Sequence, residues 1–266
     1  MSRLHLFELE DQPWLPAVLR RGVTDYLAFV ANVYDGPYRE LVRRLKLAME
    51  AMGERRLLDL ASGGSGPVRP IVRLLEEQEH YPVQATLTDL YPDLAHFEQV
   101  KAESGGRIDY VSTPVDATAV PPELKGFRLM CNAFHHLPPE LAREVLADAV
   151  AKRQGIAIFE LVERSPATLF VTALSSVNTL LATPFMRPQR LDRLALTYLL
   201  PLIPFTVVFD GIVSCLRVYS VEELKALTEG LGEGGYQWDI ERVRVGNSPL
   251  HVHLLMGRPV EPRSVS

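Results

Sequence analysis

The sequence predicts an α/β fold in which helices cover a doubly wound sheet of seven strands. From residue 55 onward, short apolar segments alternate with amphipathic segments, an order that predicts strands and helices in turn. The apolar segments are nearly continuous, which is typical of parallel strands buried on both faces. A glycine-rich turn at 62–66 follows the first apolar segment and leads into the first amphipathic one.

The elements follow one another at short intervals. Strands are expected at 57–61, 84–88, 108–112, 127–132 and 155–161, with helices at 67–79, 92–104 and 139–152. A further helix is expected at 221–230, where Ser220 is placed as N-cap and Glu223 completes a capping box. Two closing strands near 236–245 and 250–257 bring the sheet to seven.

Two segments lie outside this alternation, so the chain divides into four parts. Residues 1–54 are expected to form an N-terminal helical cap, with helices near 14–34 and 37–52. Residues 55–162 form the α/β core, and 163–219 form an apolar helical insertion after the fifth strand. Residues 220–258 supply the last helix and the closing strands.

Composition excludes several kinds of protein. The 266 residues include 28 basic and 33 acidic side chains without a basic block, so no nucleic-acid partner is expected. Cys131 and Cys215 have no metal-ligand spacing, so the sequence predicts no metal site and a reducing compartment. The first residues, MSRLHLFELEDQPW, carry acidic residues where a signal peptide needs an apolar run, so a cytoplasmic protein is expected.

The stretch LLDLASGGSGP, residues 57–67, is the first candidate ligand site. Its glycines allow a ligand to approach the backbone closely, and Pro67 suits the first position of a helix. In a parallel sheet the turn lies at the carboxyl end of a strand, where open α/β folds bind ligands. A phosphate loop is disfavoured because no Lys-Ser/Thr pair follows the glycines. A dinucleotide site is a weaker alternative, since Arg69 stands where a small residue is required.

Four segments together resemble the class I S-adenosylmethionine-dependent methyltransferases, over about 55–162 and again over 217–258. DLASGGSG is similar to their first motif, with Ala61 and Ser65 where glycine is usual. TLTDLYP carries Asp89 at the position that binds the ribose hydroxyls. VDATAVP resembles the adenine-binding segment, and CNAFHHLPPE resembles the fourth motif, where cofactor and acceptor meet. The whole chain also resembles bacterial methyltransferases, a likeness that implies no particular substrate.

The resemblance implies a Rossmann-like fold and S-adenosyl-L-methionine as cofactor. The residues that it places around the cofactor are Asp59, Ala61, Ser62, Gly63, Gly64, Gly66, Asp89, Leu90, Asp116, Ala117, Asn132 and Ala133.

His135 and His136 are the candidate catalytic residues. They follow the fourth strand, and histidine can take a proton from an acceptor near neutral pH. The alternative is that the pair only fixes the loop through hydrogen bonds. Glu160 and Glu163 after the fifth strand are either contacts for a polar substrate group or solvated rim charges. His251 and His253 share one face of the last strand, and we expect them to be structural.

The insertion holds two uncharged runs, 166–186 and 194–209. The second is short and broken by Pro201 and Pro204, so a pair of membrane spans is not expected. We expect a helical lid that lines an apolar substrate pocket, with its outer face in a homodimer or at a membrane surface. Three arginines between the runs are candidates for contact with anionic headgroups. Arg217 is expected to pair with Asp210, and an acidic substrate is its alternative partner. The arginines are Arg187, Arg190 and Arg193.

The leading functional hypothesis is a methyltransferase for a small or medium-sized, largely apolar acceptor such as a quinone, phenol, lipid or secondary metabolite. Two alternatives remain open at this point. One is a non-catalytic cofactor-binding or scaffold protein of the same fold, because Ala61 and Ser65 depart from the glycine motif. The other is a dinucleotide-dependent oxidoreductase.

Overall fold

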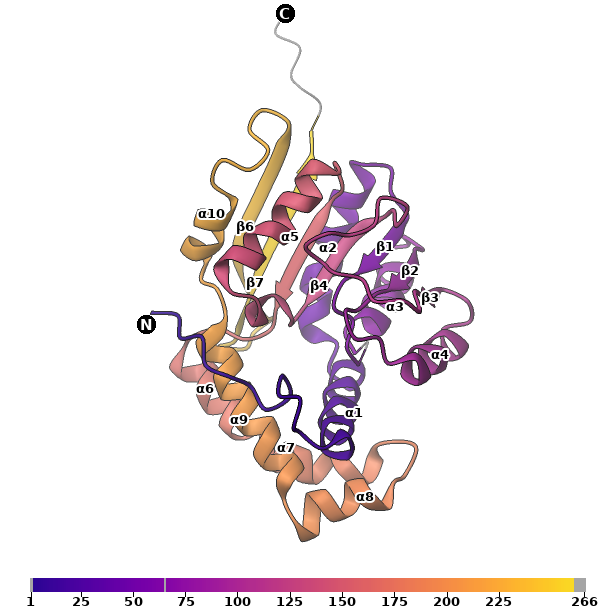
Figure 1. Cartoon of the computed structure of the whole chain (residues 1–266), viewed down its shortest axis with the longest axis vertical. Coiled ribbons are helices and arrows are strands. Elements are labelled where there is room, and N and C mark those ends of the chain that lie inside the picture. Colours follow the sequence, from indigo (N-terminus) through magenta and orange to yellow (C-terminus); the bar gives the residue numbers. More distant parts are fainter. Residues whose placement is uncertain (1, 65, 261–266) are drawn as a thin grey trace, which may run out of the picture.

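A computed structural model describes residues 2–64 and 66–260. Seven strands form one sheet in the order β3-β2-β1-β4-β5-β7-β6 (Figure 1). Neighbouring strands are parallel except β7, which runs antiparallel to β5 and β6. The strands are β1 (Arg56–Asp59), β2 (Gln84–Leu87), β3 (Ile108–Tyr110), β4 (Phe127–Cys131), β5 (Ile156–Glu160), β6 (Tyr236–Arg244) and β7 (His251–Pro259). The predicted doubly wound sheet of seven strands is confirmed.

Helices cover both faces of this sheet. On one face lie α2 (Gly36–Glu50), α3 (Val68–Glu77) and α4 (Leu94–Glu103), and on the other α5 (Pro139–Ala151) and α10 (Val221–Thr228). Successive strand residues face opposite layers, so Leu57 packs with the first set of helices and Leu58 with the second. Because both layers are apolar, the strands are buried on both faces, as their continuous apolar sequences predict.

Two of the expected helix starts can be checked directly. The capping box of α10 is present, because Ser220 Oγ accepts from the Glu223 N–H at 3.2 Å and Glu223 accepts from the Ser220 N–H at 2.7 Å. Pro67, by contrast, precedes α3 as its N-cap and is not its first residue. Ser65, in the turn before α3, lies outside the described residues.

The insertion and the first helix form a separate layer at the carboxyl edge of the sheet, which we call the helical arm (Figure 1). It consists of α1 (Ala17–Val33), α6 (Pro166–Ala173), α7 (Ser175–Ala182), the 3-10 turn η2 (Thr183–Phe185), α8 (Leu191–Leu194), the π-helical turn η3 (Ala195–Leu199) and α9 (Leu202–Arg217). Its own core joins Val23 and Tyr26 of α1 to Ala182, Ile203 and Val207 of the insertion. The inner face of the insertion therefore packs against α1 through these side chains.

The outer face of the helical arm is apolar and exposed. Pro166–Phe185 is long and apolar enough to cross a membrane, yet only 22% of its most apolar window is buried within the protein. The second run bends by 75° between Leu191–Leu199 and Leu202–Arg217, at the proline that the sequence identifies as a break. Exposed side chains on the arm include Phe170, Leu174, Val177, Leu181, Phe185, Leu191, Leu199, Leu200 and Phe205.

The three arginines of the arm do not form one exposed set, contrary to the sequence-based expectation. Arg193 is buried, donates to Asp25 at 2.7 Å and also donates to two backbone carbonyls. Arg190 pairs with Asp192 beside it, and Arg187 is exposed. Arg193 therefore joins the insertion to α1 and is not a headgroup ligand.

Asp25→Ala should lower the free energy of unfolding by about 2–3 kcal/mol, because it leaves the buried guanidinium of Arg193 without its anionic partner. Urea unfolding measures the loss. Asp192→Ala removes a more exposed partner and serves as control, with an expected change below about 1 kcal/mol. Equal effects of the two substitutions would contradict a structural role for the Arg193–Asp25 pair.

Candidate functional site

A carboxylate and a glycine turn meet at the carboxyl ends of β1 and β2. The Gly63 N–H donates to Asp89 Oδ2 at 2.8 Å, and the Tyr91 N–H donates to Asp89 Oδ1 at 2.8 Å. These two bonds orient the half-buried carboxylate toward the turn, with exposed Leu90 beside it. Asp89 and the glycine turn, the two segments expected to mark the cofactor site, therefore lie against each other.

Asp59 and Ser62 lie beneath this turn. Ser62 Oγ donates to the Asp59 carbonyl at 3.1 Å and accepts from the Thr88 N–H at 3.1 Å, so the hydroxyl ties the ends of β1 and β2 together. Asp59 is buried, and desolvation raises the pKa of its carboxyl to about 7 although Ser62 acts in the opposite direction.

The glycines of the turn serve two purposes. Gly63 has φ +47° and faces open space, as a ligand-binding glycine should. A Cβ on Gly64 would lie 2.2 Å from the Thr24 side chain, and one on Gly66 would lie 3.1 Å from the Ala28 backbone. Both contacts belong to α1. Gly64 and Gly66 therefore allow α1 to pack closely against the turn. Of these three glycines, only Gly63 leaves space beside the backbone.

Ala61 keeps the conformation that a glycine would have. Its φ is +54°, in the left-handed region that glycine adopts at little cost. Although an alanine stands where the family motif has a glycine, the backbone at this position therefore keeps a conformation typical of glycine.

The remaining expected cofactor residues come from the loops after β3 and β4. The Val115 N–H donates to the Asp89 carbonyl at 2.9 Å, which brings the first loop beside Asp89. Asp116 is exposed and accepts from the N–H and hydroxyl of Thr118, with Ala117 half-buried between them. Asn132 has φ +53° and accepts from the Leu161 N–H at 2.8 Å, and Ala133 follows it, half-buried.

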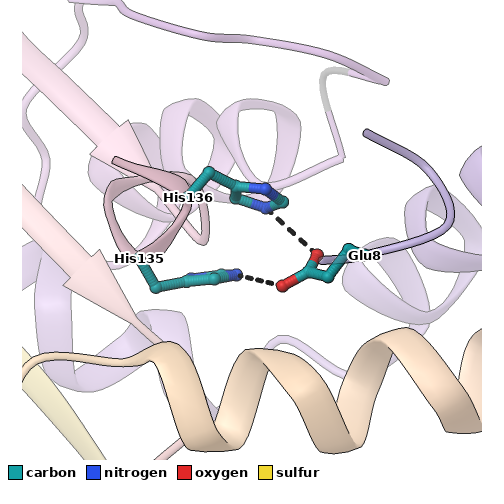
Figure 2. Close-up of side chains that lie close together, drawn as sticks. All are labelled: Glu8, His135 and His136. Atoms are coloured by element: carbon teal, nitrogen blue, oxygen red, sulfur yellow. Dashed lines mark ion pairs between the residues drawn. The ribbon is translucent and has the colours of Figure 1, made fainter. Parts of the chain in front are cut away.

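His135 and His136 lie in η1 (Phe134–His136) and face the carboxylate of Glu8 (Figure 2). His135 Nε2 is 3.7 Å from Glu8 Oε1, and His136 Nε2 is 3.5 Å from Glu8 Oε2. His135 Nδ1 donates to Glu160 Oε2 at 2.6 Å, and His136 Nδ1 donates to Asp11 Oδ1 at 3.0 Å. Each ring therefore has one nitrogen bound to a carboxylate and the other turned toward Glu8.

The N-terminal segment reaches this position because α9 binds it. Asp210 accepts from the N–H groups of Leu9 and Glu10 at 2.6 and 3.0 Å. Arg217 pairs with Asp11 at 2.8 Å and Glu8 at 3.4 Å, so the expectation that it pairs with Asp210 is wrong. Its guanidinium also donates to the carbonyls of the two histidines, which joins α9 to the loop after β4.

Two carboxyls of the N-terminal segment have shifted pKa values in opposite directions. Burial raises the pKa of Glu8 to about 7, against the attraction of His136 and Arg217. Burial also acts to raise the pKa of Asp11, but hydrogen bonds from His136 and Arg217 outweigh it and hold that pKa well below its usual range. Sequence reasoning missed both residues, and the one available signal was the acidic cluster in FELEDQP.

Glu160 and Glu163 are buried, so the interpretation as solvated rim charges is wrong. Glu160 holds His135, and Glu163 accepts from Arg242 at 2.7 and 2.9 Å. His253 donates to the Tyr219 carbonyl at 2.8 Å and lies 3.9 Å from Glu163, which agrees with a structural role.

No protein-family model and no curated protein sequence matches the chain. Solved structures match at low identity: mitomycin 7-O-methyltransferase MmcR (13% identity, TM-score 0.49) and the pyocyanin biosynthetic protein PhzM (15%, 0.46). A third is an O-methyltransferase family protein from Burkholderia thailandensis (14%, 0.46). The matches cover 91%, 82% and 82% of this chain but 55%, 58% and 55% of MmcR, PhzM and the Burkholderia protein. The chain thus spans little more than half the length of each.

The strand order of this chain defines its fold class. A parallel sheet closed by the antiparallel pair β7 and β6, with a glycine turn and an acidic residue at the ends of β1 and β2, is a Rossmann-like α/β fold, as the resemblance to class I methyltransferases implies.

Stability should fall as pH rises from about 4 to 7 because Asp59, ordinarily near pKa 3.8, titrates near 7 in the folded protein. The folded state binds this proton more tightly than the unfolded chain, so the stabilising effect is present at low pH and lost above the folded pKa. Between pH 5 and 8, the wild-type protein should lose about 2–3 kcal/mol more than Asp59→Asn in urea unfolding. Parallel pH curves would contradict a raised pKa at Asp59.

Proposed function

We propose that the protein is an S-adenosylmethionine-dependent methyltransferase that acts on a small or medium-sized, largely apolar acceptor. The observation that carries the proposal is the hydrogen bond between Asp89 and the Gly63 N–H. It holds an acidic group beside the one open glycine of the turn, at the sheet edge where open α/β folds bind ligands. An acidic residue in that position can accept from the hydroxyls of a ribose, as in dinucleotide-binding folds.

The loop after β4 supports an acceptor site next to the cofactor site. Methyl transfer requires in-line approach of the acceptor atom and exclusion of water, and a proton acceptor only when the nucleophile must lose a proton. Glu8 and α9 cover the buried imidazole of His135, while the side chain of His136 is 31% exposed. In the proposed enzyme, His135 and His136 act at the acceptor end of the site.

The alternatives have weaker support. For a dinucleotide-dependent oxidoreductase, the position that requires a small residue holds Arg69, whose side chain pairs with Glu103 at 2.6 Å. For a non-catalytic scaffold, the argument from Ala61 is weakened by its glycine-like φ of +54°.

Asp89→Ala should weaken binding of S-adenosylmethionine by about 1–3 kcal/mol, because polar groups of the ribose and the Gly63 N–H lose their acceptor. Isothermal titration calorimetry with the cofactor and its demethylated product measures this. Asp109→Ala, an exposed carboxylate of β3 paired with Lys101, is the matched control and should bind as wild type. Unchanged affinity in Asp89→Ala would refute the ribose assignment, and binding of NAD instead would refute the methyltransferase.

The acceptor class is inferred from the helical arm. The helical arm lies beside the carboxyl edge of the sheet (Figure 1), where the proposed acceptor would bind, and many of its exposed side chains are apolar. Exposed apolar patches of this extent mark contact with another surface. We propose a lipid surface as that contact, because the exposed residues continue through the short elements between α7 and α9, at Phe185, Leu191 and Leu199, and would enter the headgroup region together.

Leu181→Lys and Phe185→Lys, at positions 66% and 70% exposed, should each reduce binding to zwitterionic phosphatidylcholine vesicles several-fold, because a charge replaces apolar area that would be buried in lipid. Vesicle co-sedimentation measures the change. Leu47→Lys, 59% exposed on α2, is the control and should have no effect. If the wild type does not bind vesicles and the two substitutions instead dissociate a homodimer in size-exclusion chromatography, the lipid proposal is refuted. The exposed face of the arm would then contact a second copy of the chain.

A further inference from the structure

Three side chains from distant parts of the sequence present metal-binding atoms to one another: Glu8, His135 and His136 (Figure 2). One ligand atom from each residue, a carboxylate oxygen of Glu8 and a ring nitrogen of each histidine, lies within 4.8 Å of the other two. We propose that these three residues bind a divalent transition-metal ion of the Zn²⁺ class. The inference goes beyond the proposed methyl transfer and concerns the binding of an ion, which can be measured without the methyl donor.

The orientation of both imidazoles is the first argument. His135 Nδ1 lies 2.6 Å from Glu160 and His136 Nδ1 lies 3.0 Å from Asp11, so in the neutral tautomer that donates from Nδ1 each Nε2 carries a lone pair. Metal-bound histidines in proteins are held in this way, with a carboxylate fixing the tautomer from the far side of the ring. Here the arrangement occurs twice, and both lone pairs are directed at the same carboxylate.

The distances fit an ion between the three groups. Two ligand atoms about 2.1 Å from a tetrahedral ion are about 3.4 Å apart. The two imidazoles lie 3.7 and 3.5 Å from separate oxygens of Glu8, longer than a hydrogen bond in each case. Two histidines and one glutamate form a common ligand set for Zn²⁺ and its neighbours in the transition series.

An unsatisfied nitrogen is the second, independent argument. His135 is buried, and within residues 2–64 and 66–260 its Nε2 has no hydrogen-bond partner. A buried polar atom without a partner destabilises the folded state, because its hydration is lost and not replaced. An ion bound at Nε2 removes this cost. The Nδ1 atom cannot be rotated into its place without breaking the 2.6 Å bond to Glu160.

The surrounding charge favours a cation. Three carboxylates, from Glu8, Asp11 and Glu160, belong to the cluster or hold its rings, and Arg217 is the guanidinium that reaches Glu8 and Asp11. Arg217 lies 3.4 Å from Glu8 Oε1, while Glu8 Oε2 lies 3.5 Å from His136 Nε2. Arg3, the other nearby guanidinium, donates to the backbone carbonyls of His135 and Leu137.

The site also has an open side. The side chain of His136 is 31% exposed, whereas those of His135 and Glu8 are 4% exposed. Three protein ligands leave a fourth position for water or for a polar atom of a bound molecule, the arrangement of a catalytic and not a structural zinc site. The role of the histidines would then be to hold the ion and not to accept a proton directly.

The test is metal binding by the full-length chain. After removal of metal with a chelator, the protein is titrated with Zn²⁺ against a chromophoric competitor and separately loaded with Co²⁺. We expect about one equivalent of Zn²⁺, and for Co²⁺ the visible absorption of a four- or five-coordinate ion. His136→Gln and Glu8→Gln should each weaken Zn²⁺ binding by about 100-fold and abolish that absorption.

Two matched variants control for adventitious binding. Glu10→Gln changes a carboxyl two residues from Glu8 whose partner is Thr24, and His5→Gln changes an exposed histidine of the same segment. Both should bind Zn²⁺ as wild type does. Stoichiometry far below one, or equal affinity in His136→Gln and wild type, would overturn the proposal. Circular dichroism checks folding, and if Glu8→Gln unfolds, the partly exposed His136 decides the outcome.

Discussion

The buried guanidinium of Arg217 joins the parts of the molecule that are far apart in sequence. It lies at the end of α9, pairs with Glu8 and Asp11 of the N-terminal segment, and donates to the carbonyls of His135 and His136. A buried charge has to be compensated, so these acceptors are held around it. The N-terminal segment, the helical arm and the loop after β4 thereby acquire one relative position. The candidate acceptor site exists only because all three meet at this point.

Much of the fold could be predicted because its signals are local. Continuous apolar segments mark the parallel strands, and the pair Ser220 and Glu223 marks the start of α10, since both patterns depend on neighbours within a few residues. The break near Pro201 could be predicted for the same reason. The fold class followed from the order of these elements. The meeting of Asp89 and Gly63 could be anticipated as well, because the ends of parallel strands lie at one edge of the sheet.

The rest depends on contacts that no local pattern encodes. Glu8 and His135 are brought together by Arg217, and nothing in the spacing of either segment indicates that they meet. Glu160 and Glu163 are charged residues directly after an apolar strand, so they look like rim charges until their partners His135 and Arg242 are known. The insertion is apolar on all sides, and its composition does not say that α1 covers one of them. The absence of a metal was expected because the cysteines alone were considered, whereas the proposed ligands are two histidines and a distant glutamate.

Helix α1 contacts two regions that the proposed methyl transfer would use, the glycine turn and the helical arm. Thr24 and Ala28 lie against Gly64 and Gly66 of the glycine turn, while Val23 and Tyr26 belong to the core of the helical arm. These contacts alternate along a little more than one turn of a single helix, so α1 cannot tilt with the arm without pressing on, or withdrawing from, the turn. A movement of the helical arm on contact with another surface would therefore be transmitted through α1 to the glycine turn.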